Sequence, residues 1–114
     1  DFARFGLLFL HGGAWNGRQI LSESWVTEST AHDPTDVRPF ETAPSWAEDG
    51  GYYGYHWWGM KNADGSYDFM ARGNLGQLIH LAPRKHLVVV RFGPEPDDGV
   101  IWSVVVRSLS DQMP

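Results

Sequence analysis

The sequence predicts an α+β domain in which helices pack on an antiparallel sheet of three to four strands. Three patterns lead to this prediction. Residues 70–92 contain two strand-forming segments around a turn, residues 52–71 have the pattern of another hairpin, and apolar segments near both ends have helical character. Strands joined by short turns pair in antiparallel fashion, and the flanking helices then cover the sheet.

The size and composition limit the classes of protein that need to be considered. A chain of 114 residues is enough for one small domain, and its 42% hydrophobic content provides a core. The formal net charge of −5 and the scattered basic residues argue against nucleic-acid binding. No apolar run reaches the roughly 18 residues of a membrane span. Cysteine is absent, so reducing and oxidising compartments suit the chain equally, and its localisation stays open.

The first elements are two helices separated by a turn. Residues 1–11 are apolar almost all round, which is typical of a helix buried on several sides, and two glycines directly after them end it. Asn16-Gly17 is a favoured hairpin pair. Ser22 is a candidate N-cap for a short helix that continues to about Thr30.

Residues 31–51 are predicted to be a long surface loop with little regular structure. Three prolines interrupt this stretch, acidic residues are scattered through it, and no hydrophobic period is visible. A loop of this length is unusual in a small domain. We therefore expect it to form a rim or lid, or to rest on another part of the protein.

The aromatic segment 52–58 is predicted to be a single strand, which places Tyr53, Tyr55 and Trp57 on one face and Trp58 on the other. Both faces of one strand cannot hide so many rings without cover. Core packing and a pocket or interface wall are therefore equally good interpretations. A turn at 62–65 leads into a returning strand over 66–71.

The second strand pair follows two glycines. Gly73 and Gly76 indicate a loop that ends in a bulge, or a close approach by a ligand or another backbone. The strand over 77–81 then leads through a turn into a strand over 87–92, whose Leu-Val-Val-Val run predicts a central strand buried on both sides.

The chain is predicted to close with a helix over residues 100–109. A turn containing an Asp97-Asp98 pair precedes this helix and is expected to form its start. The residues expected on its buried side are Ile101, Val104, Val105 and Leu109.

The sequence shows no metal site and no evident activated nucleophile. The five histidines have neither H-x-x-x-H nor H-x-H spacing, so we expect no metal and no cofactor. No serine is followed three residues later by lysine, and Gly-x-Ser-x-Gly is absent. The acidic residues are better explained by solvated loops and a helix start than by acid–base catalysis.

Four blocks occur in order along the chain: DFARFGLLFLHGG at 1–13, WNGRQILSESW at 15–25, YGYHWW at 53–58 and ARGNLGQ at 71–77. Together they resemble the C-terminal part of serine hydrolases of the β-lactamase-like superfamily. The most similar branch comprises class C β-lactamases, esterases and 6-aminohexanoate-oligomer hydrolases. The resemblance covers essentially the whole chain.

The resemblance implies a mechanism with a Ser-x-x-Lys nucleophile, an assisting Tyr and a third motif, Lys-Thr-Gly or His-x-Gly, on a strand edge. It aligns the third motif with Asn74-Leu75-Gly76. Asn74 replaces the usual Lys or His, which favours ester or neutral-amide substrates over β-lactams. The backbone N–H of Gln77, directly after the motif glycine, is implied to help form the oxyanion hole.

These observations lead us to expect a single partial domain over residues 1–114. The chain opens without an initiator Met or a helix cap, and the first two motifs of the family would precede Asp1. We expect a C-terminal portion that is inactive alone and that pairs with the missing N-terminal part or self-associates. An ester or amide would be its small-molecule partner, with no nucleic acid or membrane. The implied catalytic residues are Gly76 and Gln77, and the implied substrate-binding residues are Asn74, Leu75, Trp57 and Trp58.

Two other functions remain open from the sequence. One is a binding module that stacks a ligand on the aromatic strand. The other is an oligomerisation module that uses the apolar helix at residues 2–10 as its interface.

Overall fold

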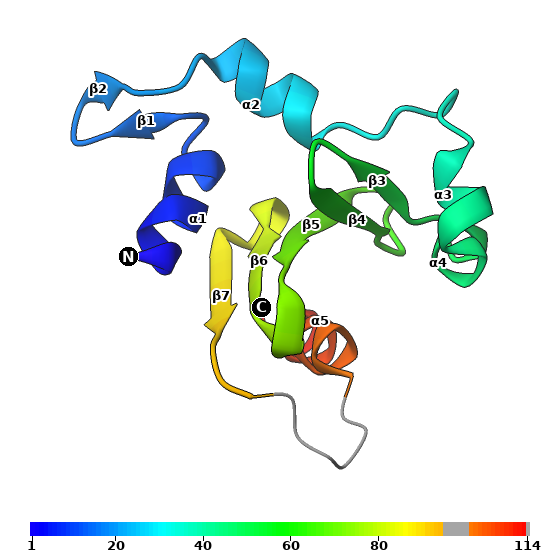
Figure 1. The fold of residues 1–114 in the computed structure, drawn as a ribbon. Coiled ribbons are helices and arrows are strands. Elements are labelled where there is room, and N and C mark those ends of the chain that lie inside the picture. The colour runs from blue at the N-terminus through cyan, green and yellow to red at the C-terminus, as the bar shows by residue number, and fades with distance from the viewer. Residues whose placement is uncertain (95–100, 114) are drawn as a thin grey trace.

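The computed structural model describes residues 1–94 and 101–113, apart from the side chains of Pro39 and Thr42. It confirms the α+β class. A five-stranded antiparallel sheet in the order β3-β4-β5-β6-β7 is covered by α1 and α2 on one face and by α5 on the other (Figure 1). The sheet has more strands than the three to four expected because the aromatic segment forms two of them.

The elements have the following bounds. The helices are α1 (Phe2–Leu10), α2 (Glu23–Thr30), α3 (Arg38–Thr42), α4 (Pro44–Glu48) and α5 (Trp102–Gln112). The strands are β1 (Ala14–Trp15), β2 (Arg18–Gln19), β3 (Tyr52–Gly54), β4 (Trp57–Lys61), β5 (Tyr67–Arg72), β6 (Leu78–Ala82) and β7 (Leu87–Arg91). Two short 3-10 turns, η1 (Asn74–Gly76) and η2 (Pro83–Lys85), flank β6.

The helices and the turn predicted for the first thirty residues are confirmed, but α1 is not buried on several sides, because only Gly6 and Phe9 are buried and Phe2 and Phe5 are exposed. Between β1 and β2, Asn16 and Gly17 have φ values of 49° and 74°, the left-handed pair of a tight two-residue hairpin. The hydroxyl of Ser22 accepts a hydrogen bond of 3.2 Å from the backbone N–H of Trp25 and so caps α2.

The prediction of an irregular loop over residues 31–51 is wrong in part, because α3 and α4 lie within it. Each of these helices has five residues, too few to show a hydrophobic period in the sequence. The prolines of this stretch were also misinterpreted as interrupting regular structure. Pro44 begins α4, where its fixed φ suits the helix and its missing N–H has no cost.

The aromatic segment is a hairpin and not the single strand that was predicted. Gly54 on β3 pairs with Trp57 on β4, and the two residues between them, Tyr55 and His56, have φ values of 49° and 70°. Such turns usually contain Asn-Gly, so the sequence did not indicate one. Tertiary contacts hold Tyr55 instead: its hydroxyl donates to Glu28 on α2 over 2.9 Å.

The prediction that the Leu-Val-Val-Val strand is central is also wrong. This strand, β7, lies at the edge of the sheet and is half-buried along its length. The strand buried at every position is β6. One face of β7 is covered by α1, which comes so close that a Cβ on Gly6 would lie 2.6 Å from Cγ1 of Val88. This cover explains the β-branched sequence of an edge strand.

The buried face of the C-terminal helix was assigned incorrectly for Ile101, Val104 and Leu109, whereas Val105 is half-buried. In α5 the residues that face the sheet are Ser103, Val106 and Ser110, whereas Val104 and Leu109 are 61% and 53% exposed. Ile101, just before the helix, is also exposed. Small serine side chains let the helix backbone approach the sheet closely, which the apolar pattern alone did not indicate. Asp97 and Asp98, expected at the helix start, lie outside the described residues.

The main core lies between the sheet and the pair α1 and α2. Buried Phe9 and Val26 come from the helices and meet Trp57, Phe69 and Ile79 from the sheet. A polar pair lies on the opposite face of the sheet, under α5. There, Nε2 of His80 lies 3.3 Å from Oδ2 of Asp68, and both side chains are buried.

Candidate functional site

The loop between β5 and β6 contains the residues predicted to form the third motif. Leu75 and Gly76 adopt successive left-handed conformations, with φ values of 59° and 72°. The backbone N–H of Gly73 donates to the carbonyl of Gln77 over 2.8 Å and closes the loop. The loop is thus a tight 3-10 turn at the end of a strand, where the sequence offered a bulge or a close approach.

The close approach at Gly76 is made by a side chain of the same chain. A Cβ on Gly76 would lie 2.8 Å from Nη1 of Arg91, on β7. This one nitrogen donates to three carbonyl groups that belong to two different loops, and Nη2 donates to a fourth. The acceptors are Leu75, Gly76 and Gly93, each at 3.0 Å, and Pro94 at 2.5 Å.

Arg91 therefore connects the loop at residues 73–77 to the segment that follows β7. Its guanidinium also lies 4.4 Å from the ring centroid of Trp102 at the start of α5. Sequence reasoning missed this residue, because one arginine at the end of an apolar strand carries no signal of its own.

We expect replacement of Arg91 by lysine to loosen the loop at residues 73–77. An ammonium group is compact and cannot span the carbonyls that the planar guanidinium reaches. Hydrogen bonds to charged groups contribute about 1.5–3 kcal/mol each, so loss of one predicts amide exchange in the loop that is about tenfold faster. Hydrogen exchange followed by NMR measures this, and Arg107→Lys is the control, because Arg107 donates to Lys61 far from the loop. Equal exchange in both variants would contradict the role.

The side chain of Gln77 makes a second connection between the same segments. Its Nε2 donates to the carbonyl of Gly93 over 2.5 Å, and its Oε1 accepts from the N–H of Gly93 over 3.2 Å. The backbone N–H of Gln77 reaches the carbonyl of Asn74 only at 3.4 Å, beyond the usual range of such bonds. The Asn74 side chain accepts from the N–H of Leu75 within the turn.

The structure separates the two tryptophans that were predicted to form one substrate wall. Trp57 is 5% exposed and packs in the core, with ring centroids 4.9 Å from Phe9 and 5.1 Å from Phe69. Trp58 points to the opposite face of the sheet and contacts Arg72, the residue before the loop. Only Trp58 is therefore associated with the candidate site.

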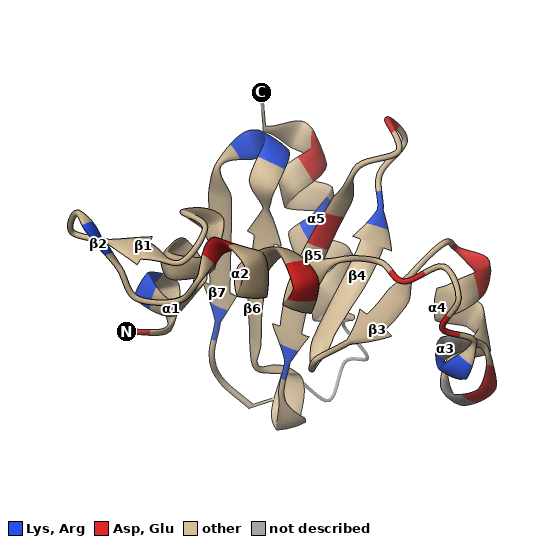
Figure 2. Ribbon diagram, turned by 90° about the horizontal axis from the view of Figure 1, so that it is seen from above, with Lys and Arg blue, Asp and Glu red and all other residues tan. Residues whose placement is uncertain are grey.

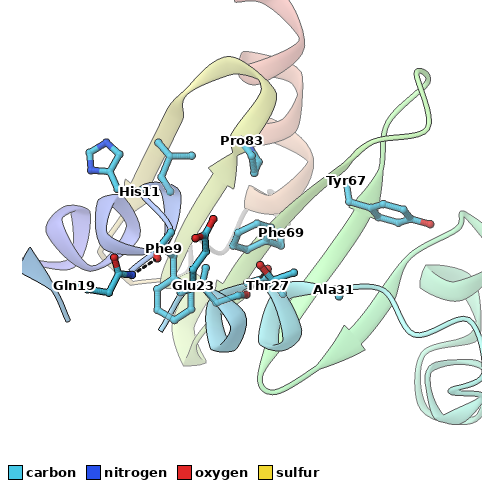
Figure 3. A pocket seen from close by; sticks show the side chains of 13 residues that line it. Phe9, His11, Gln19, Glu23, Thr27, Ala31, Tyr67, Phe69 and Pro83 are labelled. Atoms are coloured by element: carbon cyan, nitrogen blue, oxygen red, sulfur yellow. Dashed lines mark hydrogen bonds between the residues drawn. The ribbon is translucent and has the colours of Figure 1, made fainter. Parts of the chain in front are cut away.

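The hollow shown in Figure 3 lies at the end of the sheet opposite the loop at residues 73–77. It has a volume of about 680 Å³, and the residues lining it include Tyr67 at the start of β5 and Pro83 just after β6. The loop at residues 73–77 lies between the opposite ends of these strands. The side chain of Gln19 at the rim is already engaged, since it donates to the carbonyls of Gly12 and Leu21. This hollow is separate from the candidate site.

The described residues contain neither a metal-binding cluster nor a membrane-spanning helix. Within residues 1–94 and 101–113, no three His, Cys, Asp or Glu side chains gather as they would around a metal ion. None of the helices in the same ranges combines the length and apolar character needed to cross a membrane.

The comparisons with known proteins bear on the class of protein. No family model matches the chain. Sequence similarity supports a relationship to the β-lactamase-like serine hydrolases. One similar protein is the 6-aminohexanoate-dimer hydrolase of Paenarthrobacter ureafaciens, which is 31% identical over 97 residues, or 85% of this chain. The match covers 24% of that enzyme, so the chain spans about a quarter of the length of its relative.

Proposed function

We propose that these residues are the C-terminal part of a β-lactamase-like serine hydrolase and that the loop at residues 73–77 supplies its third motif and part of its oxyanion hole. The observation that carries this proposal is the similarity to a hydrolase over 85% of the chain. The tight turn after β5 supports it, because a third motif in this class lies at a strand edge.

The proposed chemical role belongs to the backbone of Gln77. Gly76 leaves no side chain beside this N–H, and the present acceptor at 3.4 Å is held only weakly. Exchanging that contact for a developing oxyanion would cost little and would place a fixed donor where negative charge appears. Asn74 and the 55% exposed Leu75 would contact the substrate beside it.

The nucleophile is proposed to come from a segment outside these 114 residues, because no serine here begins a Ser-x-x-Lys motif. The bond cleaved would be an ester or an amide. The similar Paenarthrobacter enzyme is named for its action on a dimer of 6-aminohexanoate. On this proposal, the 114-residue chain alone is inactive.

A chimera tests the proposal. The matching quarter of the Paenarthrobacter enzyme is replaced by this chain, and hydrolysis of a p-nitrophenyl ester is measured beside the chain alone. We expect activity from the chimera and none from the chain alone. A folded chimera without activity contradicts the proposal, as does a monomeric isolated chain that hydrolyses the ester well above background.

Exposed apolar residues favour a second candidate, an oligomerisation module. Phe2 and Phe5 on α1 are 54% and 45% exposed, and the outer side of α5 is also apolar. A stable dimer of this chain without a hydrolytic partner, observed by sedimentation velocity, would favour this function over the hydrolase.

A further inference from the structure

Arg72 lies between two indole rings at the end of β5. The central carbon of its guanidinium is 5.4 Å from the ring centroid of Trp58 on β4 and 5.9 Å from that of Trp46 on α4. The two rings are edge to face, with centroids 5.8 Å apart. Three separate elements of the fold thus converge on one exposed cation, and each ring attracts the guanidinium through its negative face.

The guanidinium of Arg72 has no carboxylate or carbonyl acceptor within the described ranges. Several other arginines in those ranges have a carboxylate or carbonyl partner. Arg84 lies 3.9 Å from Asp64, Arg91 is occupied by four carbonyls, and Arg107 donates to Lys61. Arg72 is therefore held in position by its side-chain stem and two rings, while its N–H donors remain open to solvent.

The position of Arg72 connects it to the candidate site. It directly precedes Gly73, where the loop at residues 73–77 begins. In the sheet it pairs with Leu78, which in turn pairs with Arg91, so the two arginines share a face about 10 Å apart. Arg91 is committed to the loop backbone, which leaves Arg72 as the cation available to a bound ligand.

We propose that Arg72, held between Trp46 and Trp58, is a carboxylate-binding subsite. The planar fork of a guanidinium matches the two oxygens of one carboxylate, and stacking reduces the freedom that is lost when the ligand binds. A cationic ligand does not fit, because a cation already occupies the rings. Phosphate groups are usually held by several donors at once, often at a helix N-terminus, and this site offers one guanidinium.

The proposal names a substrate class for the proposed hydrolase, namely an ester or amide that also carries a free carboxylate. To that extent it rests on the proposed function. It departs from the expectation based on Asn74, which favoured ester or neutral-amide substrates. The side chain of Asn74 is used within its own turn. Arg72 brings a positive charge to the neighbouring position.

Binding to the 114-residue chain tests the subsite directly. Sodium hexanoate, its methyl ester and inorganic phosphate are titrated separately while the indole N–H signals of Trp46 and Trp58 are followed by NMR. We expect hexanoate to shift both signals saturably, and the methyl ester and phosphate to leave them unchanged. If the methyl ester shifts the signals as much as hexanoate does, the ligand stacks through its apolar part. If phosphate does so, the effect is a general response to anions. Either result would overturn the proposal.

Three variants complete the test. Arg72→Gln is expected to weaken hexanoate binding about tenfold or more, and Arg72→Lys less, because lysine keeps the charge but not the fork. The control is Arg84→Gln, which removes an exposed cation elsewhere and should leave binding unchanged. Circular dichroism confirms that each variant is folded. Undiminished binding to folded Arg72→Gln would refute the assignment.

The chimera separates this proposal from the proposed function. Arg72→Gln should raise KM about tenfold for an ester that carries a carboxylate, with kcat and the KM of a neutral ester unchanged. If hexanoate binds the chain but the chimera is inactive, the subsite stands and the hydrolase assignment fails. If the chimera is active but Arg72→Gln changes neither KM, the subsite is wrong and the hydrolase assignment stands.

Discussion

Replacing Gln77 by proline in the active chimera is expected to lower kcat by about 10²–10³-fold, with little change in KM. Proline removes the backbone N–H that we assign to the oxyanion hole. The substitution suits the backbone, because Gln77 has a φ of −64°, the value that a proline ring imposes. The N–H that is lost makes only a contact of 3.4 Å with Asn74, so the turn itself should persist.

The control for this substitution is Gln77→Ala. Alanine keeps the backbone N–H but removes the two side-chain hydrogen bonds to Gly93. We expect the alanine variant to lose stability while retaining most of its activity per folded molecule. Steady-state kinetics with a p-nitrophenyl ester measure kcat and KM for the proline and the alanine variants. If the two variants lose kcat equally, the side chain is responsible and the assignment of the N–H is wrong.

Replacing Gly59 by alanine is expected to lower the free energy of unfolding by about 3 kcal/mol or more. Gly59 on β4 pairs with Tyr52 on β3, and the ring of Tyr52 lies over the glycine where a Cβ would be. Tyr52 is 3% exposed, its hydroxyl donates to the carbonyl of Thr30, and burial raises the pKa of its phenol. A methyl group would displace this ring and the contact it makes with the end of α2.

Gly54→Ala is a matched control in the same hairpin. Gly54 lies on β3, has no positive φ, and a Cβ there would meet no other atom within 4 Å. We expect its effect to stay within about 0.5 kcal/mol. Urea denaturation followed by circular dichroism compares the two variants. A similar loss in both would mean that the glycines matter for strand propensity and not for the space under Tyr52.

Several elements could be predicted because their signals are local. The helix at Phe2–Leu10, the capping role of Ser22 and the hairpin at Asn16-Gly17 each depend on a few neighbouring residues. Backbone conformation, capping and turn chemistry act over that range, so the sequence is sufficient to infer them.

The hairpin at Tyr55-His56 could not be predicted in this way. Its left-handed residues lack the usual turn chemistry and depend on α2, since Tyr55 bonds to Glu28 and packs against Trp25. Because this turn was missed, Tyr53 was assigned to the face of Trp57, whereas in the hairpin it pairs with Trp58 and shares the face of that residue.

For the candidate site, the residues of the loop could be predicted from the sequence. Of the two glycines that indicated it, Gly76 has a left-handed backbone, whereas Gly73 is extended. The tertiary structure decided what surrounds that loop. Arg91 on β7 contacts the loop, whereas Trp58 on β4 and Trp46 on α4 contact its neighbour Arg72. These contacts form because the fold brings together segments that are distant in the sequence, as the adjacent strands β4 to β7 in Figure 2 show. A local turn follows from the residues within it, whereas a contact between strands follows from register and packing, which the whole chain sets together.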